Sequence, residues 1–251
     1  MSTFVKQRAD VPDGFFEAEA AGLTWLAAAH GVRTATVIRS GPGLIELERV
    51  VDARPTADAA RRFGRDLATT HSAGATAFGA PPPGVSQIFI GSRPMAAAND
   101  ATWGGFYARA RVLPFLEIAE RVGGVGRTDA ADVREACALI AEGAFDDGEP
   151  PARIHGDLWT GNVLWTADDV VLIDPAAHGG HRETDLAMLA LFGCPYLEEV
   201  LAAYDDAAPL REGWRQRVPL HQLHPLAVHA AGHGAHYGVA LGEAARATLN
   251  V

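Results

Sequence analysis

The sequence predicts an α+β protein built of two lobes, a small β-rich lobe followed by a larger, mainly helical one. Short segments with strand character surround a single helix up to about residue 50. Helical periodicity dominates from there to the end of the chain, and a polar loop with a strand pair interrupts it near residue 155. We therefore predict a first lobe over residues 1–50, a second lobe over residues 51–251, and a cleft between them.

The first lobe contains three predicted strands and one helix. Thr3–Gln7 is the first strand, and the turn residues VPDG separate it from an amphipathic helix over Phe15–Ala29. Two strands follow over Thr34–Arg39 and Leu44–Glu48, and the turn SGPG joins them. This order gives a mostly β lobe that carries one helix.

The second lobe begins with a helix from about Thr56, whose side chain suits an N-cap, to His71. The stretch Gly74–Arg93 contains PPPG and is predicted to be a long irregular connection. A helical pattern resumes over Asn99–Asp147 in two pieces, since GGVG interrupts it and Thr128 can cap the second piece.

A polar loop follows the short strand that ends at His155. Val163–Trp165 and Val170–Ile173 come next as a hairpin-like pair joined by the turn TADD. The loop therefore lies inside the helical lobe. The remaining predicted helices cover Arg182–Phe192, Pro195–Asp206 and about Leu226–Leu249.

Composition and charge narrow the class of protein. The 251 residues are 48% hydrophobic and 21% charged, as in ordinary globular proteins, and the formal charge is −10. Such acidity disfavours nucleic-acid binding, which needs a basic face. No apolar run suits a signal peptide or a bilayer span, and Cys137 and Cys194 lack CxxC spacing. We expect a cytoplasmic protein with reduced thiols and no nucleic-acid or membrane partner.

The segment RIHGDLWTGNVLWTADDVVLIDP concentrates the polar chemistry. It places Asp157 in a loop after a strand, Asn162 five residues later, and Asp174 at the end of the second hairpin strand. Phosphoryl transfer needs a carboxylate that orients the attacking hydroxyl, and hard oxygen ligands that hold Mg²⁺ against the phosphates of ATP. A polar turn in which Asp157 and Asn162 cap backbone groups is the simpler structural alternative.

The spacing of these residues matches the active site of kinases. His155, Asp157 and Asn162 fit the H-x-D-x-x-x-x-N catalytic loop, with Asp157 as base and Asn162 on metal. Asp174 follows a strand–turn–strand, where kinases carry their second metal ligand. The sequence therefore favours an enzyme that uses ATP and Mg²⁺.

Lys6 is the only lysine among 21 basic residues. A lone lysine in an arginine-rich chain indicates a place that needs a compact ammonium, although chance survival near a terminus is the alternative. Lys6 on the first strand and Glu19 in the next helix have the order of the kinase lysine–glutamate pair that holds ATP phosphates. Glu17 is a rival partner on the same helix.

Two longer segments make the chain resemble the fructosamine kinase family, also called ketosamine 3-kinases. They are HGDLWTGN with IDPAAHGGHRETDLAMLALFG, and FVKQRADVPDGFFEAEAAGLTWL near the start, supported by LATTH. The resemblance implies a bilobal protein-kinase-like fold and phosphorylation by Mg·ATP of the 3-hydroxyl of a free or protein-bound ketosamine. It also implies that Asp185 braces the catalytic loop, that His155 supports it, and that Trp159 stacks on the sugar.

Three features depart from the family pattern. Only five residues precede Lys6, whereas the family has two strands and a Gly/Ser-rich phosphate loop there, so we expect a truncated first lobe, a misplaced start or less covered phosphates. GSRPM stands where relatives carry a PQ pair, and His178 stands where they carry tyrosine. We take His178 as a substrate-side residue.

Other candidates carry less weight. His229, His233 and His236 fall on one face of the predicted last helix and could bind Zn²⁺, but core or cleft-lining imidazoles are the favoured interpretation. Glu48 and Arg49 end a strand where the connection between lobes would offer backbone groups to adenine. The rival functions are a kinase of another amine-bearing metabolite, such as an aminoglycoside or choline, and a nucleotide-binding pseudokinase.

Overall fold

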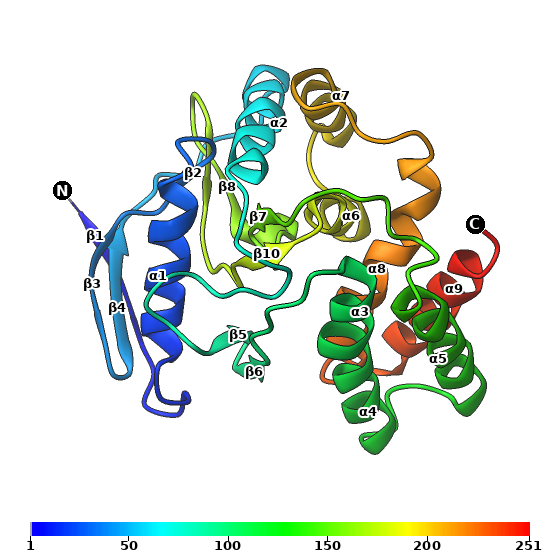
Figure 1. The fold of residues 1–251 in the computed structure, drawn as a ribbon. Helices are drawn as coiled ribbons and strands as arrows, with labels where there is room; N and C mark the ends of the chain where they lie inside the picture. The colour runs from blue at the N-terminus through cyan, green and yellow to red at the C-terminus, as the bar shows by residue number, and fades with distance from the viewer. Residues whose placement is uncertain (1) are drawn as a thin grey trace.

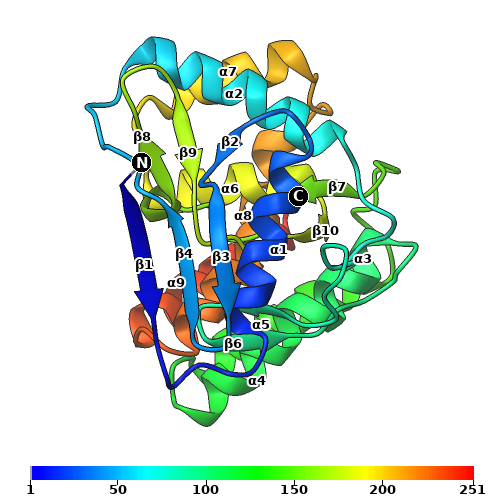
Figure 2. The ribbon, with the colours of Figure 1, turned by 90° about the vertical axis from the view of Figure 1, so that its left-hand side faces the viewer.

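The computed structural model, which describes residues 2–251, begins with a small antiparallel sheet. Its strand order is β1 (Thr3–Gln7), β4 (Leu44–Glu48), β3 (Val37–Gly41), and Lys6 lies opposite Ile45. Helix α1 (Phe15–Ala27) lies between this sheet and the larger helical body, as both ribbon views show (Figure 1, Figure 2). The predicted β lobe with one helix is thus present.

The apolar face of α1 explains its position. Phe16, Leu23, Ile45 and Leu47 are all at most 2% exposed and form one core between the helix and the sheet. Val171, from the hairpin of the larger lobe, belongs to the same core. Burial of large apolar side chains is worth about 1.5–3 kcal/mol each, so this small core also fixes the sheet against the rest of the chain.

A second sheet joins the two parts of the chain. β2 (Arg33–Thr34) pairs in parallel with β9 (Val170–Leu172), which pairs antiparallel with β8 (Val163–Trp165). The single strand predicted over Thr34–Arg39 is therefore wrong, because its two ends belong to different sheets. The predicted hairpin of the larger lobe is confirmed.

Two short antiparallel strand pairs complete the strand structure. β5 (Ile88–Ile90) pairs with β6 (Arg93–Met95) inside the stretch that we expected to be irregular. β7 (Ala152–Ile154) pairs with β10 (His178–Gly180), which the sequence did not predict. The second pair brings the two ends of the polar segment together.

Helix α2 (Ala57–Ser72) starts as predicted. The hydroxyl of Thr56 accepts a hydrogen bond from the N–H of Ala59 at 3.2 Å, so the predicted N-cap is confirmed. Along its length α2 packs against α7 (Leu197–Ala207) at the top of Figure 1, with α6 (Arg182–Phe192) beneath.

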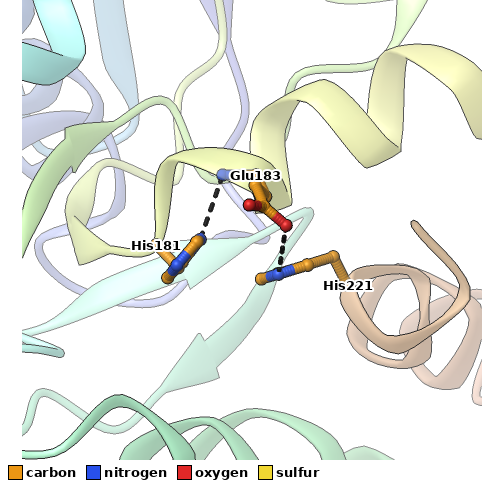
Figure 3. Close-up of side chains that lie close together, drawn as sticks. All are labelled: His181, Glu183 and His221. Atoms are coloured by element: carbon orange, nitrogen blue, oxygen red, sulfur yellow. Dashed lines mark hydrogen bonds and ion pairs between the residues drawn. The ribbon is translucent and has the colours of Figure 1, made fainter. Parts of the chain in front are cut away.

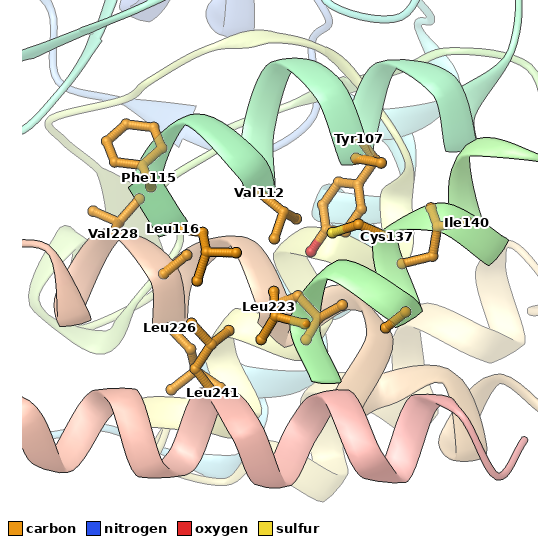
Figure 4. Close-up of a cluster of buried hydrophobic side chains, with 14 of the residues drawn as sticks. Tyr107, Val112, Phe115, Leu116, Cys137, Ile140, Leu223, Leu226, Val228 and Leu241 are labelled. Carbon is orange, nitrogen blue, oxygen red and sulfur yellow. The ribbon is translucent and has the colours of Figure 1, made fainter. Parts of the chain in front are cut away.

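The remaining helices form the other half of the larger lobe. Their apolar faces meet in one cluster that includes Val112, Leu116, Cys137, Leu223 and Leu241 (Figure 4). Cys137 and Cys194 are both buried free thiols, as predicted. The helices are α3 (Trp103–Phe106), the π-helix η1 (Tyr107–Val112), α4 (Leu113–Arg121), α5 (Arg127–Ala141), α8 (Trp214–Ala230) and α9 (Ala235–Thr248).

Two helix boundaries differ from the prediction. Helix α5 begins two residues earlier than expected, with Gly126 at the N-cap, so Thr128 lies inside the first turn and is not the cap. The single helix predicted from Leu226 to Leu249 is two helices, α8 and α9. Gly234 has a φ of 112°, a conformation open to glycine but not to a helical residue, and it separates them. Within residues 2–251, no helix is long and apolar enough to cross a bilayer.

The α2–α7 contact gives a direct test of this packing. A methyl group at Gly64 would overlap the carbonyl oxygen of Val200 on α7. Gly64→Ala should therefore lower the free energy of unfolding by about 1–3 kcal/mol, the usual cost of overpacking. Urea denaturation would measure the loss, with Gly41→Ala, which meets nothing within 4 Å, as the matched control. Equal stability of the two variants would contradict the close helix contact.

Candidate active site

The polar loop after β7 is held by a buried carboxylate. Asp185 on α6 is 1% exposed and accepts hydrogen bonds from the N–H groups of His155, at 2.7 Å, and Gly156, at 2.9 Å. His71 approaches the same carboxylate at 3.2 Å. Burial alone would raise the pKa of Asp185, but these hydrogen bonds hold it below its usual value. The predicted contact between Asp185 and the loop is therefore present.

His155 fixes the loop from inside. Its Nε2 donates to the carbonyl oxygen of Ile173 at 2.9 Å, which leaves Nδ1 to accept the N–H of Asp157 at 3.2 Å. One imidazole thus joins the start of the loop to the end of strand β9. This bond places the residue after Ile173, Asp174, beside the same loop.

Asp157 and Asn162 face each other across the loop. The amide nitrogen of Asn162 donates to the backbone oxygen of Asp157 at 2.8 Å and to its carboxylate at 3.1 Å. The 3₁₀ turn η2 (Thr160–Asn162) reverses the chain, so that the side chain of Asn162 points back to Asp157. Burial raises the pKa of Asp157 to about 7, and the bond from Asn162 works in the opposite direction. A carboxylate of this kind is matched to accept a proton near neutral pH.

Lys6 connects the first lobe to this loop. Its ammonium lies 2.8 Å from Glu19 on α1 and also contacts the carboxylate of Asp174. Glu19 is nearly buried, whereas Asp174 is 43% exposed. Glu17, the rival partner, forms no ion pair with Lys6 within the described chain. The Lys6–Glu19 pairing expected from the sequence is therefore formed.

One cavity of about 290 Å³ collects most of these side chains. Lys6 and Glu19 of the first lobe line it together with residues of the catalytic loop. The predicted site residues in its wall are Lys6, Glu19, Asp157, Trp159, Asn162 and Asp174. Active sites commonly lie in a cleft between lobes, where a carboxyl group with a shifted pKa, a cation and an amide come together.

Aromatic residues that the sequence did not single out close the cavity. Phe15 of α1 meets Phe89 of β5 edge to face, with ring centroids 5.4 Å apart, and both line the wall together with Ile88. The turn of the β5–β6 hairpin reaches the cavity through Gly91, so the GSRPM segment does lie at the site. Two adjacent phenylalanines at the start of a helix, FF in VPDGFF, were the available signal.

Three predicted residues lie elsewhere. His178 is buried, and its Nδ1 donates to the carbonyl oxygen of Ala176 at 2.7 Å, so it sits behind the cavity wall. The carboxylate of Glu48 accepts from Arg33 at 2.8 Å. The N–H groups of Glu48 and Arg49 donate to the carbonyl oxygens of Thr36 and Ser2, so these two donors are already used. The expected substrate contact of His178 is corrected, whereas a contact of this strand end with adenine stays a prediction.

The oxygen atoms at the site suit Mg²⁺. Among residues 2–251, no donor bonds the side-chain oxygen of Asn162, because its nitrogen makes the contacts with Asp157. Asp174 adds a half-exposed carboxylate with one oxygen beyond the Lys6 contact. Mg²⁺ prefers such hard oxygen ligands and keeps several waters. Asn162 and Asp174 therefore fit a metal site that also admits phosphate oxygens.

A second polar cluster, His181, Glu183 and His221, lies beside the start of α6 (Figure 3). Glu183 lies 3.3 Å from His221 and forms a two-point ion pair with Arg217 at 2.5 and 3.0 Å. Although burial opposes it, the bonds from His221 and Arg217 hold the pKa of Glu183 at about 2. Because a metal ion would have to displace Arg217, we interpret the cluster as an ion-pair network that holds α6 to α8.

The three C-terminal histidines are divided between two helices and the turn that joins them, although the rings of His229 and His233 lie 5.0 Å apart. His229 ends α8 and His236 starts α9, while His233 lies in the turn between them. In the part of the chain that the structure describes, the side-chain groups close enough to hold a metal do not include them. Their interpretation as ordinary core or cleft-lining imidazoles stays a prediction.

Comparisons with known proteins find a matching family, related sequences and similar solved structures. A sequence model of the fructosamine kinase family matches residues 1–250. A probable ketoamine kinase of Thermus thermophilus is 33% identical over 246 residues, which cover 97% of this chain and 86% of that protein. The crystal structure of a protein described as a candidate fructosamine-3-kinase of Thermobifida fusca superposes with a TM-score of 0.93 and 49% identity, over 99% of this chain and 86% of that one.

The fold also extends to more distant kinases. A thermostable mutant of an aminoglycoside phosphotransferase has a TM-score of 0.60 at 16% identity, over 99% of this chain and 86% of its own. At that identity the likeness shows the fold alone. The predicted bilobal, protein-kinase-like α+β class is thereby confirmed.

The carboxylate that holds the loop can be tested by stability. In Asp185→Asn, an amide N–H₂ would replace one acceptor and face the N–H of His155 or Gly156. A buried N–H left without an acceptor costs about 1–3 kcal/mol, so the free energy of unfolding should fall by that amount. Urea denaturation checks it, with exposed Asp206→Asn as a control that should stay within about 0.5 kcal/mol. A loss no larger than that of the control would mean that Asp185 does not hold the loop.

Proposed function

Because the chain belongs to the fructosamine kinase family, whose members transfer phosphoryl groups to sugar hydroxyls, we propose that it phosphorylates the 3-hydroxyl of a ketosamine with Mg·ATP. The acceptor is a ketose joined to an amine, either free or on a protein. One observation carries the proposal: Lys6, Asp157, Asn162 and Asp174, from distant parts of the sequence, line a single cavity.

The nucleotide end of the cavity is the side of Lys6. Glu19 holds the ammonium at 2.8 Å, so the charge is fixed where phosphate oxygens of ATP would need it. Asn162 and Asp174 would hold Mg²⁺ through their side-chain oxygens. When bound, the ion neutralises charge on the phosphates. The chain's own contribution at this end is to bind and orient the phosphates.

The acceptor end is the side of Asp157. Its carboxylate is fixed by Asn162 and can take the proton of the attacking hydroxyl as the oxygen bonds to phosphorus. Trp159 lies two residues away, lines the cavity and is 40% exposed, so part of its ring is available to a sugar. Phe15 and Phe89 would exclude water from the reacting groups.

A substrate panel tests the proposal against its rivals. ATP consumption with Mg²⁺ would be measured on ribulosamines, fructosamines, aminoglycosides and choline. Consumption dependent on the ketosamines supports the proposal. Consumption with an aminoglycoside or choline alone would assign another amine-bearing acceptor. No consumption with any of them would favour a nucleotide-binding pseudokinase.

The pKa of Asp157 predicts the pH dependence. Asp157 accepts a proton only when ionised, and its pKa is about 7, so kcat/KM for the acceptor should fall about tenfold per unit as the pH drops below 7. Asp157→Asn should lower turnover by about 10²–10⁴ and lose this acidic limb. Protonation of ATP at low pH lowers the rate of the wild-type protein and of Asp157→Asn alike, so the difference between their pH profiles reports on Asp157. An acidic limb that persists unchanged in the variant would show that another group titrates.

Lys6 gives a second kinetic test. Lys6→Arg keeps the charge, but a planar guanidinium cannot occupy the place of an ammonium held between Glu19 and Asp174. We expect kcat/KM for ATP to fall about five- to a hundredfold, with little change in melting temperature. Arg39→Lys, in an exposed ion pair with Glu46 on the same sheet, is the control. Equal efficiency of both variants would remove Lys6 from the phosphate site.

A further inference from the structure

Arg111 is a fully buried arginine without a carboxylate partner. It lies in the π-helix η1, is 1% exposed, and forms no ion pair with any described residue. Its Nη1 donates to the carbonyl oxygens of Ala96 and Ala110, both at 2.9 Å, and its Nε donates to Nε2 of His178 at 3.3 Å. The guanidinium also lies over the ring of Phe106 at 4.5 Å. Nη2 has no partner within residues 2–251.

Two further polar atoms near Arg111 also lack partners in the described chain. They are Nε1 of Trp103 and Nε2 of His224. His224 uses its Nδ1–H to donate to the carbonyl oxygen of Arg111 at 3.0 Å, so its Nε2 is an acceptor in the neutral ring. Arg111 Nη2 and Trp103 Nε1 are donors. Buried polar atoms are seldom left without a partner, so three in one place need an explanation.

All three residues line one enclosed cavity behind the catalytic loop. Its volume is about 10 Å³, and Gly156 and His178 line it as well. That volume holds a single water molecule. A water oxygen can accept from Arg111 and Trp103 while one of its hydrogens is donated to His224. A halide ion could accept the same two bonds, but it would face the lone pair of His224.

The same side chains reach the active site through His178. The Nδ1–H of His178 donates to the carbonyl oxygen of Ala176 at 2.7 Å, and Ala176 lines the catalytic cavity. A methyl group at Gly156, the residue before Asp157, would overlap that carbonyl oxygen and lie 3.0 Å from the His178 ring. His178 is thus wedged between the catalytic loop and the segment that follows Asp174, with Arg111 behind it.

We propose that this cavity binds one ordered water molecule, and that Arg111 and His178 are positioning residues that hold the segment after Asp174 against the catalytic loop. The water forms hydrogen bonds with the three unpaired atoms. The successive hydrogen bonds from Arg111 to His178 and from His178 to Ala176 hold Ala176 in the wall of the catalytic cavity. The water site is independent of the proposed activity, whereas its effect on turnover rests on that activity.

A crystal structure of the full chain, with one crystal soaked in bromide, tests the water site. We expect a density peak within hydrogen-bond distance of Arg111 Nη2, Trp103 Nε1 and His224 Nε2, and no anomalous signal from bromide there. An anomalous peak in the cavity would make it an anion site instead. An empty cavity would also overturn the proposal.

Kinetics test the positioning role. Arg111→Met removes both the donor to His178 and the donor to the water, so kcat should fall about ten- to a hundredfold through misplacement of the reacting groups. KM for ATP should change less than about twofold, because Lys6 and Glu19 are untouched. Arg109→Met, at an exposed position of the same π-helix, should leave both constants unchanged.

A second variant keeps the test decisive if Arg111→Met does not fold. His178→Phe retains a ring of similar shape but loses both hydrogen bonds, and it should show the same fall in kcat with KM for ATP preserved. Wild-type kcat in either folded variant would overturn the positioning role. If the wild-type protein itself turned over no ketosamine, the proposed function would be refuted, whereas the water site would be unaffected.

Discussion

The active site depends on the hydrogen bonds that Asp185 accepts from the backbone of the catalytic loop. Two N–H groups, of His155 and Gly156, point at one buried carboxylate, which His71 also approaches. An unpaired charge is costly in an apolar interior, so α6 and the loop cannot separate unless the carboxylate of Asp185 is exposed to water or loses its hydrogen bonds. The direction of Asp157 is therefore set by a residue that never meets the substrate.

The ammonium of Lys6 in the first lobe joins the two halves of the site, because it contacts Glu19 of its own lobe and Asp174 of the larger one. Lys6 lies on β1, which pairs with β4, and Ile45 and Leu47 of β4 share a core with α1 and β9. This pairing and packing bring the ammonium to Glu19 and Asp174. Asp174 reaches the same place because His155 bonds the carbonyl oxygen of the preceding Ile173. Packing and hydrogen bonding thus bring together residues separated by up to 168 positions in the sequence.

Local signals predicted the parts of the site that lie within one segment. The spacing of Asp157, Asn162 and Asp174 depends on neighbouring residues, and all three lie in the wall of one cavity. The cap at Thr56 is equally local, and it is confirmed. Features decided by tertiary contacts were not predictable: the strand over Thr34–Arg39 divides between two sheets. His178 stands where the family carries tyrosine, which indicates a substrate contact, but sequence does not tell which side of a short strand faces the cavity.

The central claim is that phosphate passes from ATP to the 3-hydroxyl of a ketosamine. The most direct measurement is ³¹P–¹H correlation NMR of the product formed from a ribulosamine or fructosamine with Mg·ATP. The account predicts one new phosphate ester coupled to the proton on C3, formed in equal amount with ADP. An ester at another carbon, or ADP formed without any ester, would contradict it.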